Sequence, residues 1–268
     1  KSHAFAVSLP FIFARDDAAR LEMTTGVMRV WVDDALVTRA SVTSAVTNGN
    51  FTTDVSGWSD QDGGSAVSAW VAGGYLSLIG TVNAAAKRRQ EVTVANIGVR
   101  HALNIEIVRG PALIRVGSAA GGDEYISETT LLTGSHSLAF TPTGNFWIDI
   151  FAFNEAAALV SSINVASVGV MEITTPWVEA DLRSLRWDQS GDVVLVACAG
   201  YRQRRIERRA VDSWSVVVYE CDDGPFRIQN VGPITITPSA TSGDITLTAS
   251  ASLFRSTQVG TLFRLSQT

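Results

Sequence analysis

Three histidines, His3, His101 and His136, are the first residues to consider for chemistry. They lie far apart, and none has a metal-ligating partner three or four positions away, so the sequence contains no helix-borne metal site. Ser135 directly precedes His136, but no strand, Gly-x-Ser-x-Gly and helix pattern surrounds the pair. We therefore predict a hairpin over residues 133–140 and no hydrolase triad.

Several carboxylates lie in turn-like stretches: Asp60, Asp62, Asp123 and Glu124. A glycosidase needs two carboxyl groups at a set separation, and nothing in the sequence pairs these acids. The sequence therefore predicts a protein that is not an enzyme, with a cell-wall or polysaccharide hydrolase as a less favoured alternative. The glycine-rich stretch 117–125 is followed by a strand pattern and lacks Gly-Lys-Ser/Thr, which predicts a turn and no phosphate loop.

Exposed aromatic rings beside planar polar groups are typical of sugar recognition, because sugar C–H groups pack on the face of a ring. Our candidates for a glycan site are Trp70, Tyr75, Asp123, Glu124 and Tyr125. The last three either line a loop that contacts a ligand or calcium, or are simply solvated. Each aromatic residue is alternatively a core residue, and we expect Trp58 and Trp147 in the interior.

An arginine-rich stretch, YRQRRIERRAV, covers residues 201–211. It contains Arg202, Arg204, Arg205, Arg208 and Arg209. On a strand, alternation places Arg202, Arg204 and Arg208 on one face and the other two on the opposite face, so no single basic plane results. The stretch is either a solvated strand with ion pairs to Glu207 and nearby acids, or a subunit interface or channel wall near DNA.

Composition describes a globular protein with 46% hydrophobic residues and a net charge of −5, which gives no general attraction for nucleic acid. No apolar run approaches the ~20 residues that span a bilayer, and no secretion signal is recognisable at the start. The two cysteines, Cys198 and Cys221, form no disulfide framework or metal-ligand spacing. They are either small buried thiols or neighbours across a hairpin, and no cofactor is indicated.

The chain has the pattern of a nearly all-β protein with little helix. Residues of alternating polarity at 103–107 and 245–248 predict half-buried strands, and apolar runs at 192–200 and 213–220 predict buried ones. Turn residues recur every eight to twelve positions, as in sandwiches, barrels and propellers. One short helix is expected at 178–187, where Val178, Leu182 and Leu185 share a face.

A shift in composition divides the chain. Residues 43–170 are rich in small and polar residues and hold six basic against ten acidic side chains, most of the net negative charge. Small-residue stretches border this segment on both sides, as expected for an inserted domain whose ends lie close together. We therefore predict a domain at 43–170 inserted into a discontinuous domain of residues 1–42 plus 171–268. Both ends look cut from a longer protein.

The segment 43–170 contains a recognisable series of strand motifs. They are NGNFTTDVSGW (48–58), GGYLSLIG (73–80), RRQEVTV (88–94), HALNIEIVRG (101–110), ALIRVG (112–117), TGSHSLAFTPTGNFWIDIFAF (133–153) and SSINVASVGV (161–170). This series resembles the carbohydrate-binding-module-like jelly rolls, also called galactose-binding-like β-sandwiches. The resemblance implies a jelly-roll fold, and many such sandwiches are structural decoration.

The flanks carry a second resemblance. Its motifs are SLPFIFARDDAARLEMTTGVMRVWVDDALV (8–37), the blade-like unit PWVEADLRSLRW to CDDGPF (176–226) and SASLFRSTQVGTLFRL (250–265). These resemble bacteriophage tail nozzle or tubular tail proteins, although DALV stands where that family often has a Gly-Gly turn. Within the blade-like unit we expect strands at 193–198, at 204–211 and from Trp214 onward.

Together the two resemblances imply a structural protein of the virion. The flanks would assemble as a ring homo-oligomer, sixfold by analogy, with other tail proteins as partners, and the jelly roll would face outward. The alternative is a receptor-binding role in which the jelly roll binds host-surface polysaccharide. Copies on a symmetric assembly would then raise the effective affinity.

Overall fold

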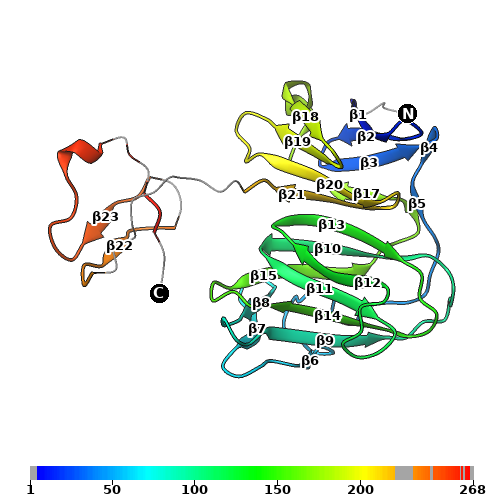
Figure 1. Cartoon of the computed structure of the whole chain (residues 1–268), viewed down its shortest axis with the longest axis horizontal. Helices are drawn as coiled ribbons and strands as arrows, with labels where there is room; N and C mark the ends of the chain where they lie inside the picture. Colours follow the sequence, from blue (N-terminus) through cyan, green and yellow to red (C-terminus); the bar gives the residue numbers. More distant parts are fainter. Residues whose placement is uncertain (1–4, 221–231, 242–243, 260, 262, 266–268) are drawn as a thin grey trace. The chain divides into compact units, whose positions relative to one another are not determined.

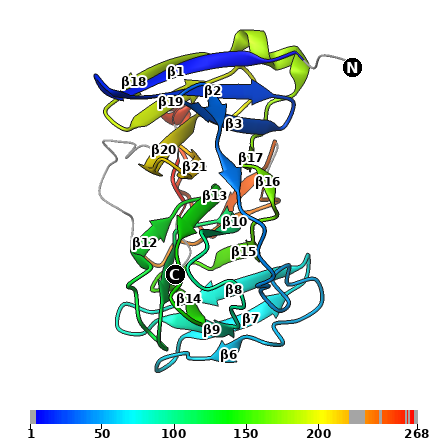
Figure 2. The ribbon, with the colours of Figure 1, turned by 90° about the vertical axis from the view of Figure 1, so that its right-hand side faces the viewer.

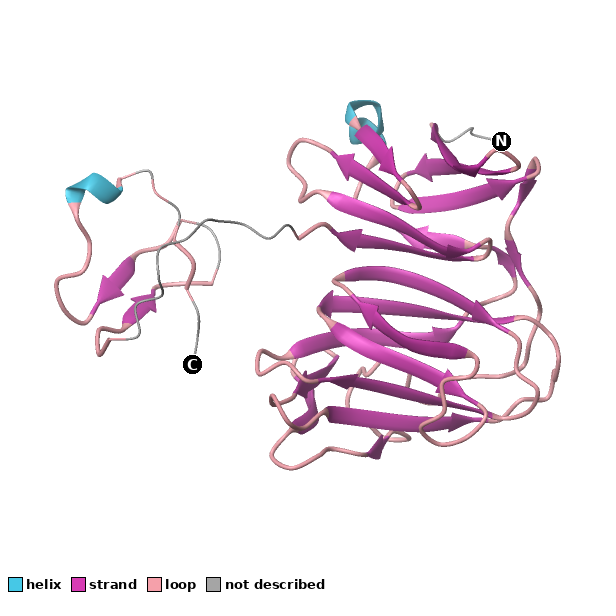
Figure 3. Ribbon diagram, in the orientation of Figure 1, coloured by secondary structure: helices cyan, strands magenta, loops and turns pink. Residues whose placement is uncertain are grey.

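A computed structural model describes residues 5–220, 232–241, 244–259, 261 and 263–265 (Figure 1). Strands dominate the described chain (Figure 3), so the predicted all-β class with little helix is confirmed. The short helix expected at 178–187 is the 3-10 helix η1 (Glu179–Ser184), and a second one is η2 (Ser256–Gln258). The chain forms two compact units, residues 1–220 and residues 221–268.

The first unit contains three main antiparallel sheets. One follows the order β1 (Val7–Ala14), β2 (Asp17–Thr24), β3 (Val27–Val32) and β17 (Glu172–Thr174), with β4 (Ala35–Leu36) also paired to β3. A second follows the order β12 (Ile126–Leu131), β11 (Ala112–Gly117), β14 (Phe146–Ala152), β9 (Ala86–Val92) and β6 (Ser59–Asp60).

The third sheet has nine strands and joins distant parts of the sequence. Its order is β18 (Arg186–Ser190), β19 (Val193–Ala197), β20 (Arg204–Ala210), β21 (Ser213–Val218), β13 (Gly134–Phe140), β10 (His101–Arg109), β15 (Ala158–Val165), β8 (Tyr75–Ile79) and β7 (Val67–Val71). The three strands expected in the blade-like unit are therefore present as β19, β20 and β21, whereas its DDGPF motif lies outside the described residues.

Two separate clusters of buried side chains fill the first unit. The flanking core is formed by residues from 5–37 and from 171–216, and includes Phe11, Val30 and Trp214. The central core is formed by residues from 46–165, and includes Ile105 and Phe146. Figures 1 and 2 show the sheets around the two cores stacked one above the other, with β21 and β13 at their junction.

The nine-stranded sheet serves both cores, but with opposite faces. On β13, Leu138 faces the central core, whereas on the neighbouring β21, Trp214 and Val216 face the flanking core. Ser137 pairs with Trp214 and Ser135 pairs with Val216. Since paired residues share a face, the buried row switches sides between these two strands.

The close approach of β13 and β21 requires a glycine. Gly134 pairs with Val217 and has φ of 140°, a conformation that L residues with side chains rarely adopt. A Cβ atom at this position would lie 2.2 Å from the carbonyl oxygen of Val216. Gly134 therefore allows the two strands to pair at the end of the ladder.

The chain passes between the cores twice at the same place. The outgoing segment forms β5 (Thr38–Arg39) and the returning segment forms β16 (Gly169–Val170), and the two pair with each other. These strands lie near the predicted boundaries at 42/43 and 170/171. The division at those boundaries stays a prediction, because one sheet is continuous across both cores.

The second unit begins where the flanking domain was expected to continue. Its described part pairs β22 (Ile236–Pro238) with β23 (Leu247–Ala249), and Phe254 packs edge-on against Phe263 with ring centroids 5.7 Å apart. The sequence had assigned residues 171–268 to one domain with 1–42, whereas residues 221–268 form a compact unit of their own.

Candidate functional site: the polar junction

Buried serines line the ladder between β13 and β21. They are Ser135, Ser137, Ser213 and Ser215. Ser135 Oγ donates to Glu106 Oε1 at 2.9 Å, and Ser137 Oγ donates to Asn104 Oδ1 at 2.8 Å. Ser213 Oγ accepts a hydrogen bond from the backbone N–H of Ala139 at 2.9 Å. Together with Arg39, Arg100, His136 and Asp212, these residues form what we term the polar junction.

His136 lies inside the junction with both ring nitrogens bonded. Its Nε2 lies 2.9 Å from the carbonyl oxygen of Leu132, and its Nδ1 lies 2.9 Å from Ser215 Oγ. Burial lowers the pKa of His136 to about 4, so the ring is neutral near pH 7. A carbonyl only accepts, so Nε2 carries the proton and Nδ1 accepts from the Ser215 hydroxyl.

A second serine–histidine pair joins Ser44 Oγ to His101 Nε2 at 2.9 Å. His101, His136 and Ser215 are each at most 2% exposed, and Ser44 is 8% exposed. A nucleophile must reach a substrate carbonyl, and these hydroxyls are enclosed by protein. Both pairs satisfy buried polar atoms, which is a structural role.

Three charged residues connect the chain crossing to the ladder. Asp212, in the turn between β20 and β21, accepts two hydrogen bonds of 2.8 Å from Arg100, just before β10. Arg39 Nη1 lies 3.9 Å from the same carboxylate, and Arg39 Nη2 donates to Ser137 Oγ at 2.7 Å and to the Asp212 carbonyl at 2.8 Å. The trio has a net charge of +1.

Burial and the neighbouring charge of opposite sign act in opposite directions on the pKa of Arg39 and on that of Asp212. The side chain of Arg39 is only 5% exposed, and loss of hydration lowers its pKa despite the charge of Asp212. Burial alone would raise the pKa of Asp212, but the hydrogen bonds and charge of Arg100 and the charge of Arg39 hold it below its usual value. Arg39 Nε and Nη1 are buried and have no hydrogen-bond partner among the described residues.

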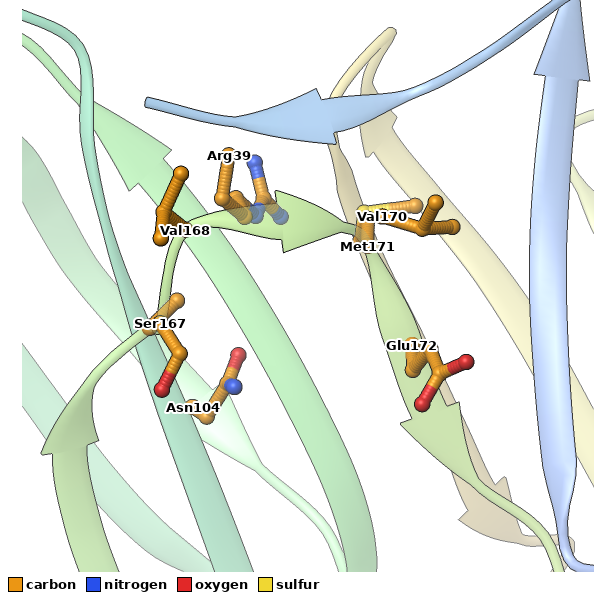
Figure 4. Close-up of a pocket in the computed structure, with 8 residues that line it drawn as sticks. Arg39, Asn104, Ser167, Val168, Val170, Met171 and Glu172 are labelled. Carbon is orange, nitrogen blue, oxygen red and sulfur yellow. The ribbon is translucent and has the colours of Figure 1, made fainter. Parts of the chain in front are cut away.

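A pocket of about 390 Å³ lies beside Arg39 and the β16 segment. Asn104, Ser167 and Glu172 supply polar groups, and Val168, Val170 and Met171 supply apolar ones. Figure 4 shows Arg39 beside β16, with Asn104 and Glu172 lying across from each other. Glu172 is also bonded to Arg29 at 2.6 Å. The lining therefore combines polar and aliphatic side chains.

The predicted glycan residues are not brought together. Trp70 on β7 pairs with Leu76 and so shares the face of the central core, with its indole N–H donating to the Phe51 carbonyl at 2.8 Å. Tyr75 pairs with Val71 and so points to the opposite face. Their strands form one edge of the nine-stranded sheet.

Asp123, Glu124 and Tyr125 precede β12, the end strand of the other sheet of this sandwich. Tyr125 packs on the central core, stacks on Phe140 at 5.9 Å and bonds Thr143 Oγ1 at 2.7 Å. Glu124 accepts a hydrogen bond from the Ser118 backbone at 3.0 Å, while Asp123 is exposed.

Two other tryptophans were expected in the interior. Trp58 is 3% exposed and belongs to the central core, which confirms the prediction for that residue. For Trp147 the prediction is wrong: it is only half-buried and lies on the face of β14 opposite Ile148 and Ile150. Strand alternation places it with Asp149 on that outer face.

The arginine-rich strand has the predicted alternation, with Arg204 and Arg208 on the face of Ile206 and Arg205 and Arg209 on the other. Arg205 and Arg209 both pair with Glu207, at 2.5 and 3.1 Å. Arg208 pairs with Asp17 at 2.9 Å, and Arg202 pairs with Glu220 at 3.2 Å. A role in a subunit interface or DNA channel stays a prediction.

Within the described ranges, no three His, Cys, Asp or Glu side chains are grouped as metal ligands. The helices of that part of the chain are too short and polar to cross a bilayer. Cys198 is buried as a free thiol, and Cys221 lies outside the described residues. No protein-family model matches this chain, and no curated protein matches it significantly.

Sequence reasoning did not identify the polar junction. A signal was present in the paired Ser-x-Ser motifs, at 135–137 and 213–215, which place two serines on one strand face. Arg39, by contrast, lies in a stretch of small residues, and its partner Asp212 is 173 positions away. Nothing local predicts that contact.

Because burial depresses the pKa of His136 to about 4, the unfolded chain takes up the proton first as the pH falls below about 6.5. The folded state therefore loses stability between pH 6.5 and 4, by roughly 3 kcal/mol in total. We expect His136→Gln to lack this component. Denaturant unfolding of both proteins at pH 7 and pH 3.5 measures it, and equal pH dependence would contradict the assignment.

Asp212→Ala leaves Arg39 without its only carboxylate partner among the described residues and frees Arg100. We expect a loss of about 2–3 kcal/mol, below the ~3–5 kcal/mol typical of fully buried pairs because Asp212 is one-fifth exposed. Glu220→Ala is the control, since it breaks an exposed pair with Arg202 and should cost less than about 1 kcal/mol. If chemical unfolding gave the same loss in the free energy of unfolding for both variants, the trio would contribute no more to stability than an exposed ion pair.

Proposed function

We propose that this chain is a structural component of a phage tail, nozzle-like in its flanks, with the central sandwich as an outward-facing decoration. The resemblance of the flanking segments supports the tail assignment. The single observation that carries the structural role is the continuous nine-stranded sheet, which connects the two cores through the β13–β21 ladder.

A flexible Gly/Ser-rich linker would leave a module free to move relative to its carrier. Here both crossing segments are paired as β5 and β16, and the Arg39–Asp212–Arg100 trio joins the crossing to both halves. Such a joint fixes the sandwich relative to its carrier. A fixed joint suits a building block of a larger assembly.

The proposed partners are other copies of this chain in a closed ring, sixfold by resemblance, and further tail proteins within the virion. In a ring with rotational symmetry, the interface joins two different surface patches of neighbouring subunits. The five arginines of the 201–211 stretch are proposed contributors to that interface or to a channel wall. The buried Ser–His pairs favour this role over catalysis.

Native mass spectrometry and negative-stain microscopy of the full chain test the assembly. We expect a closed ring of several copies with one sandwich projecting from each subunit. A single monomeric species at high micromolar concentration would contradict the ring.

A second candidate function is glycan binding, favoured by the pocket beside Arg39. Its volume of about 390 Å³ and its mixture of amide, hydroxyl, carboxylate and aliphatic groups suit one sugar residue of a polysaccharide. This location differs from the predicted aromatic site, whose residues do not line the pocket. Trp70 and Tyr75 also point to opposite faces of their sheet.

Titration with host polysaccharides tests this candidate. We expect Asn104→Ala to weaken binding by up to about tenfold, since one amide hydrogen bond to a ligand is worth about 0.5–1.5 kcal/mol. Trp70→Ala should leave binding unchanged. The reverse pattern would return the site to the aromatic residues, and no binding by the parent chain would leave the sandwich as decoration.

A further inference from the structure

Strands at the edge of a sheet leave backbone N–H and C=O groups open, and these can pair with a strand of another molecule. In the part of the chain that the structure describes, three edge strands have such groups bonded by side chains from elsewhere in the fold. The strands are β1, β7 and β12. The side chains are Gln189, Asp62, Arg88 and Arg209.

On the edge of β1, Gln189 bonds both backbone groups of Ile12. The side-chain amide of Gln189 donates to the Ile12 carbonyl at 2.7 Å, and its Oε1 accepts from the Ile12 N–H at 3.0 Å. This is the same donor and acceptor pair that a neighbouring strand would offer. Gln189 comes from β18, the end strand of the nine-stranded sheet. Pro10, two positions before Ile12, has no N–H to offer on the same side.

On the edge of β7, two charged residues bond both backbone groups of Ser68 in the same manner. Asp62 Oδ2 accepts from the Ser68 N–H at 2.6 Å, and Arg88 Nη2 donates to the Ser68 carbonyl at 2.5 Å. The other oxygen of Asp62 accepts from the Lys87 N–H on β9 at 2.7 Å. One carboxylate therefore connects the facing sheets at their open side.

On β12, Arg209 Nη2 donates to the Thr130 carbonyl at 3.2 Å. The first two edges also carry exposed apolar side chains, with Ile12 63%, Phe13 55% and Val67 51% exposed. An open edge with apolar side chains is the usual starting point for strand-to-strand association. Without the bonded side chains, these edges would therefore be able to pair with a strand of another molecule.

We propose that Gln189, Asp62, Arg88 and Arg209 are edge caps that prevent a second copy of this chain from adding a strand to β1, β7 or β12. With strand addition prevented, copies of the chain can associate only through contacts between side-chain surfaces, and such contacts are specific for a defined neighbour. Strand addition, in contrast, uses main-chain groups that every copy presents. The inference does not depend on the tail assignment.

Gln189→Met and Asp62→Ala remove two caps, the first at nearly constant volume. The matched controls are Gln203→Met and Asp123→Ala, which change exposed side chains that make no hydrogen bond within the described chain. Light scattering after size exclusion measures assembly, and hydrogen exchange measures protection of residues 7–14 and 67–71. We expect each cap variant to form reversible larger species with new protection in its own strand, and the controls to match the parent chain.

Loss of stability also causes association, so a second variant separates the two causes. Val67→Lys places a charge on the β7 edge without restoring the bonds of Asp62. In the Asp62→Ala background, we expect Val67→Lys to return the parental assembly state. Persistent association in the double variant would overturn the proposal, as would cap variants with the parental assembly and exchange pattern.

Discussion

The pairing of β13 with β21 is the constraint on which the rest of the first unit depends. Ser137 opposite Trp214 and His136 opposite Ser215 place the buried rows of the two strands on opposite faces. One sheet can then cover two cores, and no side chain belongs to both of them. The cost is a row of polar residues where the rows exchange sides, and each of these must find a hydrogen-bond partner.

The small serine side chains find such partners while they occupy little volume. The charged side chains lie where the chain crosses between the cores, since Arg39 belongs to the crossing strand β5. The buried Arg39 bonds Ser137 and the Asp212 carbonyl, and the single carboxylate of Asp212 lies between Arg39 and Arg100. Glu106 lies in the same environment, where burial raises its pKa although Ser135 bonds to it. The junction is therefore sensitive to protonation at more than one residue.

The sequence was sufficient for features that depend on local pattern. Alternation and turn residues predicted strands at 193–198 and 204–211 and the opposite faces of Arg204 and Arg205, because side-chain direction follows directly from strand geometry. The sequence was insufficient for features that depend on which distant strands pair and in which register. Trp70 and Tyr75 are five positions apart, yet they face opposite sides because of a hairpin register that their types do not encode. The serine motifs acquire meaning only once β13 and β21 are neighbours.

The paired segments β5 and β16 bring the chain in and out of the central sandwich at one point. An exchange of the central segment between related genes needs two junctions in the sequence, one near each paired strand, and both would lie at the same place in the fold. The shared sheet restricts which modules succeed. A replacement must present to β21 a glycine opposite Val217, a small side chain opposite Trp214 and a hydrogen-bonding side chain opposite Ser215. Recombination at this point would therefore favour relatives of the same sandwich over unrelated folds.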